Sequence, residues 1–184
     1  TIRNVGINPT RTGLIEVMKK MGADIQVLAQ REEAGEPVAD LRVKSALLKG
    51  VMIGPDLIPQ TIDEFPILCA AAAVAEGDTV ISGAEELRVK ESDRIATMGQ
   101  ELQAMGALIT ERPDGMVIQG LGRGGENGRL RAVSGAKSHG DHRVAMSLAI
   151  GGLTADRPMA IADSGCIDTS FPNFETTLSQ LLTR

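Results

Sequence analysis

Two segments with apolar side chains on every side constrain the fold more than any other feature of the chain. They read FPILCAAAAVA at 65–75 and VAMSLAIGGL at 144–153. A helix that is apolar all round has no face suited to water. Both segments therefore predict helices that are buried on all sides.

The same order of elements follows each apolar segment. A short strand comes next, and an amphipathic helix follows the strand, as the spacing of apolar residues indicates. The predicted ranges are 79–82 and about 93–105 in one case, and 158–162 and about 173–182 in the other. This order repeats after about 80 residues, which is far longer than the repeat of a solenoid.

A third copy of the pattern begins the chain. A strand is predicted at 1–5 and an amphipathic helix at about 12–20. The pentapeptide MGADI at 21–25 follows this helix, and MGALI at 105–109 follows the helix at about 93–105. In both copies the glycine is predicted to end the helix in a left-handed conformation.

The repeat predicts an α/β domain built from a few similar units, with buried helices inside and sheets around them. The copy at the start of the chain has no apolar segment before its strand at 1–5. We therefore expect residue 1 to fall within a unit and a buried helix to lie upstream. Without that helix an apolar groove would be exposed, and exposed apolar patches promote association.

Composition excludes several functional classes. Hydrophobic residues make up 42% and charged residues 23%, which is typical of a globular domain. The net charge of −5 and the three Phe, with no Trp or Tyr, argue against a nucleic-acid partner. No apolar run reaches about 18 residues, so no membrane span is expected. Cys69 and Cys166 are too few for a disulfide framework or a zinc site, which favours reduced thiols in a cytoplasmic protein.

The segment at 120–125 matches the pattern G-x-G-x-x-G. A dinucleotide-binding loop of this kind must open a helix, yet Glu126-Asn127-Gly128-Arg129 follows without any helix signal. The segment also lacks the Lys-Ser/Thr of a phosphate-binding P-loop. We therefore expect a hairpin loop at this position.

Two predicted helix starts carry cations where the helix dipole disfavours them. If Ser92 and Asp141 cap these helices, the cations close to their first turns are Lys90, Arg94, His142 and Arg143. Taken singly, the cations at each helix start are consistent with solvated surface charges. At the helix that begins near Ser92, the carboxylates Glu91 and Asp93 would neutralise them. Taken together they predict an anion site, because a helix N-terminus beside arginine binds phosphate or carboxylate well.

Asp63 lies at a third helix start, in the segment PQTIDEFP at 59–66. It is suited to capping this helix, with Pro66 tolerated in the first turn. Alternatively it is a general base that faces the anion site.

Several of these segments resemble motifs of the 5-enolpyruvylshikimate-3-phosphate synthase family. LRVKESDR at 87–94 resembles its R-x-K-E-[ST]-D-R signature, and DHRVAM at 141–146 resembles its D-H-R-[MIV]-A-M motif. The segments 59–63 and 169–172 also match, and NPTRTG at 8–13 resembles the second, glyphosate-insensitive bacterial class. The resemblance covers essentially the whole chain in family order.

The resemblance implies transfer of the enolpyruvyl group of phosphoenolpyruvate to the 5-hydroxyl of shikimate 3-phosphate, with release of phosphate. It implies no metal or organic cofactor. The family fold is an inside-out α/β fold of two similar domains, each made of three β-α-β-α-β-β units, with the active site between them. Residues 1–184 would be the C-terminal domain, incomplete at its start, and would hold about half of the site. The N-terminal domain, on the same or a separate chain, would be its partner.

Roles for individual residues follow from the resemblance alone. Asp63 would accept a proton and contact the ring hydroxyls of shikimate 3-phosphate, and Lys90 would contact the same substrate. Glu91 would transfer a proton at the enol methylene. Arg94 and Arg143 would bind phosphoenolpyruvate through their planar forks.

Two further positions are less closely tied to these roles. His142 would lie beside the site, behind the residues that contact the substrates. Some family members carry Lys where this chain has Thr169, so Thr169 is given no phosphate-binding role.

Two alternatives stay open. A UDP-N-acetylglucosamine enolpyruvyl transferase shares the fold and the phosphoenolpyruvate chemistry, but it lacks the string KESDR at 90–94. The second alternative is an inactive half that binds only anions or a partner chain.

Overall fold

The computed structural model describes residues 1–122 and 128–183 of the chain. Its strands are β1 (Ile2–Gly6), β2 (Asp24–Glu33), β3 (Glu36–Lys44), β4 (Met52–Ile53), β5 (Glu76–Ile81), β6 (Leu108–Arg112), β7 (Gly115–Leu121), β8 (Ser134–Lys137) and β9 (Ala160–Ala162). Its α-helices are α1 (Gly13–Lys20), α2 (Ile58–Thr61), α3 (Phe65–Ala73), α4 (Arg94–Ala104), α5 (His142–Gly152) and α6 (Phe174–Leu182). Short 3-10 helices are η1 (Pro9–Arg11), η2 (Glu85–Val89) and η4 (Ser164–Thr169).

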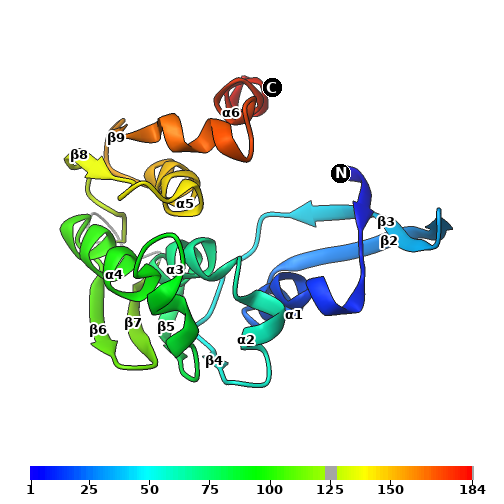
Figure 1. The fold of residues 1–184 in the computed structure, drawn as a ribbon, viewed down its shortest axis with the longest axis horizontal. Coiled ribbons are helices and arrows are strands. Elements are labelled where there is room, and N and C mark those ends of the chain that lie inside the picture. The colour runs from blue at the N-terminus through cyan, green and yellow to red at the C-terminus, as the bar shows by residue number, and fades with distance from the viewer. Residues whose placement is uncertain (123–127, 184) are drawn as a thin grey trace.

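The described strands form three separate sheets. Their orders are β1-β3-β2, β4-β5-β7-β6 and β8-β9. In the four-stranded sheet, β4 pairs parallel to β5, whereas β7 pairs antiparallel to both β5 and β6. Figure 1 shows the sheets at the periphery and α3 and α5 toward the middle. The predicted fold, with helices inside and sheets outside, is confirmed.

The core lies between the helices and the inner face of the four-stranded sheet. Side chains of β5 and β7 alternate between the core and solvent, as expected for a sheet with one wet face. Met116 and Ile118 point inward and are fully buried. α3 packs against both α5 and β7, and α4 packs against β6. The predicted helices at 65–75, 93–105 and 173–182 and the strands at 1–5, 79–82 and 158–162 are found within a few residues of their expected bounds.

The turns after α1 and α4 have the predicted geometry. Gly22 and Gly106 have φ angles of 93° and 89°, which place both in the left-handed region that glycine adopts easily. Each lies one residue after the methionine that caps the helix, and both methionines are fully buried. The repeated Met-Gly-Ala sequence therefore ends two helices in the same way.

The expectation that the two apolar helices are buried on all sides is wrong for one face of each. Ile67 and Ala71 of α3 and Ile150 of α5 are only partly buried. They line an apolar groove of about 260 Å³ between α1, α3 and α5. The residues that line it are Leu14, Met18, Ile67, Ala70, Ala71, Val74, Ile150, Gly151 and Thr154. No described element covers this groove, which explains the incomplete burial.

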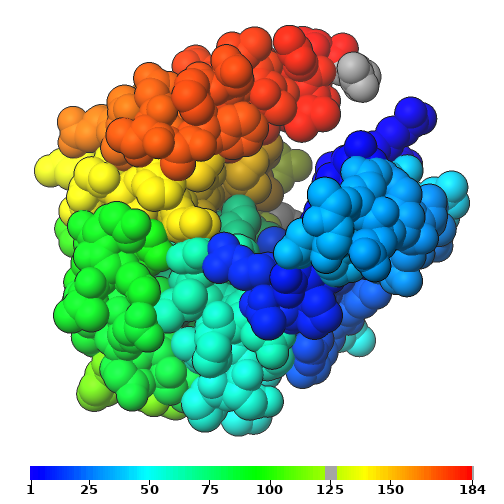
Figure 2. Space-filling model, turned by 45° about the vertical axis from the view of Figure 1, so that its right-hand side comes forward, coloured from blue at the N-terminus to red at the C-terminus, as the bar shows by residue number. Residues whose placement is uncertain are grey.

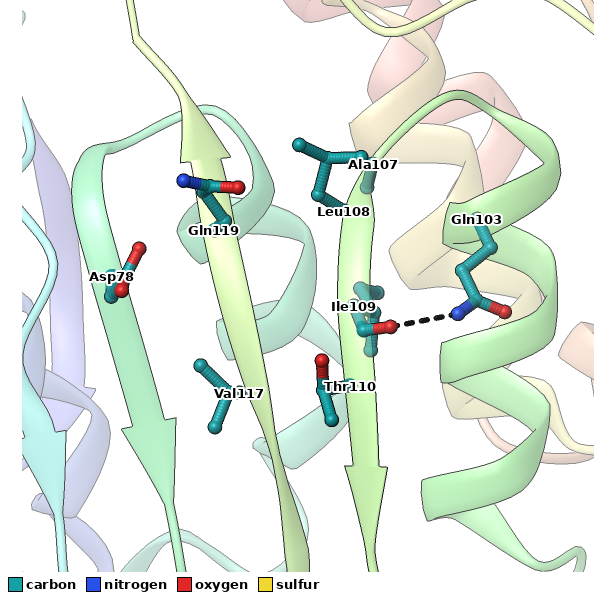
Figure 3. A pocket seen from close by; sticks show the side chains of 8 residues that line it. All are labelled: Asp78, Gln103, Ala107, Leu108, Ile109, Thr110, Val117 and Gln119. Carbon is teal, nitrogen blue, oxygen red and sulfur yellow. Dashed lines mark hydrogen bonds between the residues drawn. The ribbon is translucent and has the colours of Figure 1, made fainter.

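A larger hollow lies elsewhere, on the wet face of the four-stranded sheet (Figure 3). It measures about 570 Å³, and Asp78, Leu108, Thr110 and Gln119 are among the side chains that line it. Its single ionisable side chain provides no cluster for catalysis or anion binding. The charged residues, and not the size of this hollow, therefore indicate the functional site.

Two further expectations concern loops and membranes. The end of the G-x-G-x-x-G segment, residues 123–125, lies outside the described residues, and its start belongs to β7 and the turn after it. Within residues 1–122 and 128–183, no helix has the length and apolar character needed to cross a bilayer.

Candidate functional site

The starts of three helices meet at one end of the helical layer. α3, α4 and α5 pack against one another in pairs. Asp63 lies just before α3, Arg94 is the first residue of α4, and Arg143 is the second residue of α5. The partial positive charges of helix N-termini are therefore gathered at the same place as two arginines. This is the arrangement of an anion site.

Three guanidinium groups surround the carboxylate of Asp63. Nη2 of Arg11 lies 3.2 Å and Nη2 of Arg143 lies 3.4 Å from its Oδ2, and Nη1 of Arg94 lies 3.8 Å from its Oδ1. Nη1 of Arg143 also donates a hydrogen bond of 3.2 Å to the backbone carbonyl of Asp63. Glu64, not Asp63, occupies the N-cap position of α3. The helix-capping interpretation of Asp63 is therefore wrong.

Arg94 is the most deeply buried cation of the site. Its side chain is 1% exposed, and its Nε donates a 2.9 Å hydrogen bond to Oδ2 of Asp141, which is fully buried. Nη2 of Arg94 donates to Glu91 at 2.6 Å. Among the described residues, its Nη1 is buried without a hydrogen-bond partner. A buried N–H group left in this state is a place where a ligand oxygen can bind.

Asp141 joins the starts of α4 and α5. Its Oδ1 caps α5 by accepting from the backbone N–H groups of Arg143 and Val144, while its Oδ2 binds Arg94 of α4. Burial alone would raise the pKa of Asp141. The hydrogen bond and the charge of Arg94 lower it, as do the two backbone N–H groups, and these effects together outweigh burial. The net result is a lowered pKa. Asp141 is therefore a carboxylate throughout the neutral range.

One predicted helix cap is confirmed and the other is wrong. Asp141 caps α5, but α4 is capped by Asp93, which accepts from the backbone N–H of Ala96. The hydroxyl of Ser92 instead donates to Asp141 at 3.2 Å. Aspartate and serine are both common N-caps, so the sequence alone could not choose between adjacent positions.

The remaining predicted site residues lie around this cluster at different depths. Glu91 contacts Arg94 directly. Lys90 forms an ion pair of 2.7 Å with Glu86 one turn earlier. His142 is partly buried at the start of α5. The hydroxyl of Thr169 donates to the carbonyl of Cys166 within η4.

Two residues of the cluster were not singled out from the sequence. Arg11 reaches Asp63 from η1, and it lies within the NPTRTG segment that carries part of the family resemblance. Glu64 is half-buried beside Asp63. Burial and the charge of Asp63 raise its pKa, and Arg143 and Arg11 only partly offset this. The position of Glu64 next to Asp63 was the only signal in the sequence that could have indicated it.

Comparison with known proteins identifies the family of the chain. The family model described as "EPSP synthase (3-phosphoshikimate 1-carboxyvinyltransferase)" matches residues 1–178. The chain belongs to the EPSP synthase family. It is 52% identical over 183 residues to a 3-phosphoshikimate 1-carboxyvinyltransferase of Geobacter sulfurreducens, and 53% identical over 180 residues to one of Acidithiobacillus ferrooxidans. These matches cover 100% and 98% of this chain, but only 41% and 40% of the relatives.

Solved structures agree with this EPSP synthase assignment. An EPSP synthase from Acinetobacter baumannii superposes with a TM-score of 0.90 at 47% identity, covering 96% of this chain and 40% of that one. The enolpyruvyl transferase NikO from Streptomyces tendae superposes with a TM-score of 0.64 at 17% identity, covering 93% and 35%, and shows the fold alone. The chain thus spans about two fifths of the length of the EPSP synthases that it matches.

We expect Asp141→Asn to destabilise the protein by about 3–5 kcal/mol at neutral pH, because it removes the charged partner of a buried guanidinium. The free energy of unfolding, measured by urea titration from pH 3 to pH 8, checks this. Since the pKa of Asp141 is lowered by folding, its contribution is present above the ordinary Asp pKa of about 3.9 and is lost as the pH falls through the folded value. The difference in the free energy of unfolding between the unchanged protein and the Asp141→Asn variant should therefore shrink below about pH 4.

Asp78→Asn is the matched control, because Asp78 lies on the wet face of the four-stranded sheet. It should leave the free energy of unfolding nearly unchanged. A destabilisation of the Asp141 variant no larger than that of the Asp78 variant would mean that the buried pair contributes little.

Proposed function

We propose that this chain supplies about half of the active site of a 3-phosphoshikimate 1-carboxyvinyltransferase. The reaction transfers the enolpyruvyl group of phosphoenolpyruvate to the 5-hydroxyl of shikimate 3-phosphate and releases phosphate. It is a step of the shikimate pathway toward chorismate and the aromatic amino acids, and the cytoplasmic location stays a prediction. The observation that carries the proposal is the carboxylate of Asp63 held among Arg11, Arg94 and Arg143.

The chemistry requires these residue types. The 5-hydroxyl loses a proton as its oxygen attacks the central carbon of phosphoenolpyruvate, and the enol methylene gains a proton. The tetrahedral intermediate then expels phosphate, and the methyl group returns a proton to restore the double bond. Both substrates are anions, so cations must bind them and offset their repulsion. A carboxylate base and a second proton-transfer group are also needed.

Each role can be given to a residue of the cluster. Asp63 accepts the hydroxyl proton, and Glu91, which contacts Arg94, transfers the proton at the methylene. Arg94 and Arg143 bind phosphoenolpyruvate, and the buried Nη1 of Arg94 donates to one of its oxygens. Lys90 binds shikimate 3-phosphate, which requires that it exchange Glu86 for the substrate phosphate.

One observation favours a second candidate, an isolated half that binds anions without turnover. The chain spans 41% of the Geobacter sulfurreducens relative, so more than half of that enzyme has no counterpart here. Phosphate release by this chain joined to the N-terminal part of the Geobacter sulfurreducens relative, compared with the isolated chain, separates the candidates.

We expect Asp63→Asn in the full-length enzyme to lower kcat by roughly 10²–10⁴-fold, because the amide cannot accept the hydroxyl proton. Steady-state release of phosphate measures this, and a circular dichroism spectrum checks that the fold survives. Asp78→Asn is again the control and should keep normal turnover. A near-normal kcat with an intact spectrum would mean that Asp63 is not the proton acceptor and only forms ion pairs with the arginines.

We expect Arg143→Lys to raise the KM for phosphoenolpyruvate more than it lowers stability. Lysine keeps the charge but loses the fork that can bind a carboxylate or phosphate through two bonds. Steady-state kinetics and a urea melt of the same variant make the comparison. An unchanged KM with a lower free energy of unfolding would mean that Arg143 is only a structural ion-pair residue.

We also infer that residues 1–184 form a C-terminal domain whose first unit continues upstream. In the four-stranded sheet, β5 has β4 on one edge and β7 on the other, and α3 connects β4 to β5. β1 is the counterpart of β5, but within the described residues it pairs only with β3. An upstream strand beside β1, followed by an apolar helix in the groove between α1, α3 and α5, would complete the unit. Figure 2 shows the hollow between the N-terminal and C-terminal segments of the chain.

We therefore expect the isolated chain to associate or aggregate through this apolar groove. Light scattering and denaturant melts of the chain, alone and joined to the upstream part of the Geobacter sulfurreducens relative, measure this. The joined protein should be better dispersed and should unfold more cooperatively. A cooperative monomer of the isolated chain, with the groove closed by its own residues, would refute the inference.

A further inference from the structure

Glu101 is a buried carboxylate that the proposed reaction does not use. It lies on α4, seven residues after Arg94, so the two side chains project from similar faces of the helix. Its side chain is 8% exposed. Burying a charge of this kind is costly unless it is well bonded, so the partners of Glu101 indicate its purpose.

Both oxygens of Glu101 bind the segment that leads into α5. Oε2 accepts a 3.0 Å hydrogen bond from the backbone N–H of Lys137, and Oε1 accepts a 2.8 Å hydrogen bond from Nε2 of His139. Arg94 binds Asp141, which lies four residues after Lys137 in the same segment. α4 therefore holds the 137–143 segment at two points.

The segment needs this support because its backbone is strained. His139 has a φ angle of 54°, in the left-handed region that residues other than glycine adopt at a cost, and Gly140 follows with a φ angle of 75°. The hydroxyl of Ser138 stabilises the turn by donating to the carbonyl of Asp163 and accepting from the N–H of Gly140. This turn fixes where α5 begins, and hence where Arg143 lies.

We propose that Glu101, through His139 and Lys137, is a positioning residue for the phosphoenolpyruvate-binding end of α5. The proposal rests on the proposed function, because it assigns Arg143 to phosphoenolpyruvate. The bonds described for Glu101 lead to the 137–139 segment, so its effect is transmitted through the backbone. Lys90, which is assigned to shikimate 3-phosphate, lies at the end of η2, on a different segment, so its contact with that substrate does not run through this turn.

The test compares the KM values of the two substrates in the full-length enzyme. Glu101→Ala and His139→Gly should each raise the KM for phosphoenolpyruvate roughly tenfold, because small displacements of a binding group have large effects. The KM for shikimate 3-phosphate should rise less, because of the residues assigned to that substrate only Asp63 contacts Arg143. His139→Gly keeps the left-handed backbone at no steric cost, so it still tests the proposal if Glu101→Ala fails to fold.

A conservative variant and a matched control complete the design. Glu101→Gln keeps one acceptor oxygen for the N–H of Lys137 and can donate to the other tautomer of His139, so it should recover most of the affinity. Gln103→Ala also removes a side-chain hydrogen bond of α4, but that bond reaches the carbonyl of Ile109 in β6 (Figure 3). It should leave both KM values unchanged.

The outcomes separate this inference from the proposed function. If Arg143→Lys raises the KM for phosphoenolpyruvate while Glu101→Ala and His139→Gly do not, the proposed function stands and the positioning role is wrong. Equal increases in both KM values would also overturn the positioning role, because they indicate general damage to the fold. If Arg143→Lys has no effect on the KM, the assignment of Arg143 to phosphoenolpyruvate fails first.

Discussion

The hydrogen-bonded ion pair between Arg94 and Asp141 is the interaction on which the site depends. Both side chains are buried, and the pair joins the first residue of α4 to the cap of α5. Isolated, either charge would be very costly in this position. Together they bring two helix N-termini and two arginines to one place, with an Arg94 N–H group left over for a ligand. The arrangement that we propose for anion binding is thus built into the packing of the core.

Much of the fold could be predicted because the same sequence pattern occurs twice in full and once in part. Helices apolar on every side, short strands and Met-Gly-Ala helix ends each reflect a local physical requirement, and they were found where the residues indicated. The incomplete burial of α3 and α5 could not be predicted from their own residues. Burial depends on which neighbours are present, and one face of each helix borders the open groove between α1, α3 and α5.

The site could be predicted as a set of residues but not as a network. Cations at helix starts broke a local rule and so marked Arg94 and Arg143. The sequence did not reveal that Arg11 would reach Asp63 from 52 positions away, or that Glu101 would bind His139 across 38. Such contacts follow from tertiary packing, which periodicity does not describe. The choice of Asp93 over Ser92 as a helix cap was also decided by packing, since Ser92 turns to Asp141.

We propose that this chain supplies half of a catalytic site for enolpyruvyl transfer. The most direct measurement is phosphate release from phosphoenolpyruvate by this chain joined to the N-terminal part of the Geobacter sulfurreducens relative, with the isolated chain beside it. We expect release that requires shikimate 3-phosphate in the joined protein and no release by the isolated chain. A well-folded joined protein that binds both substrates without releasing phosphate would contradict it.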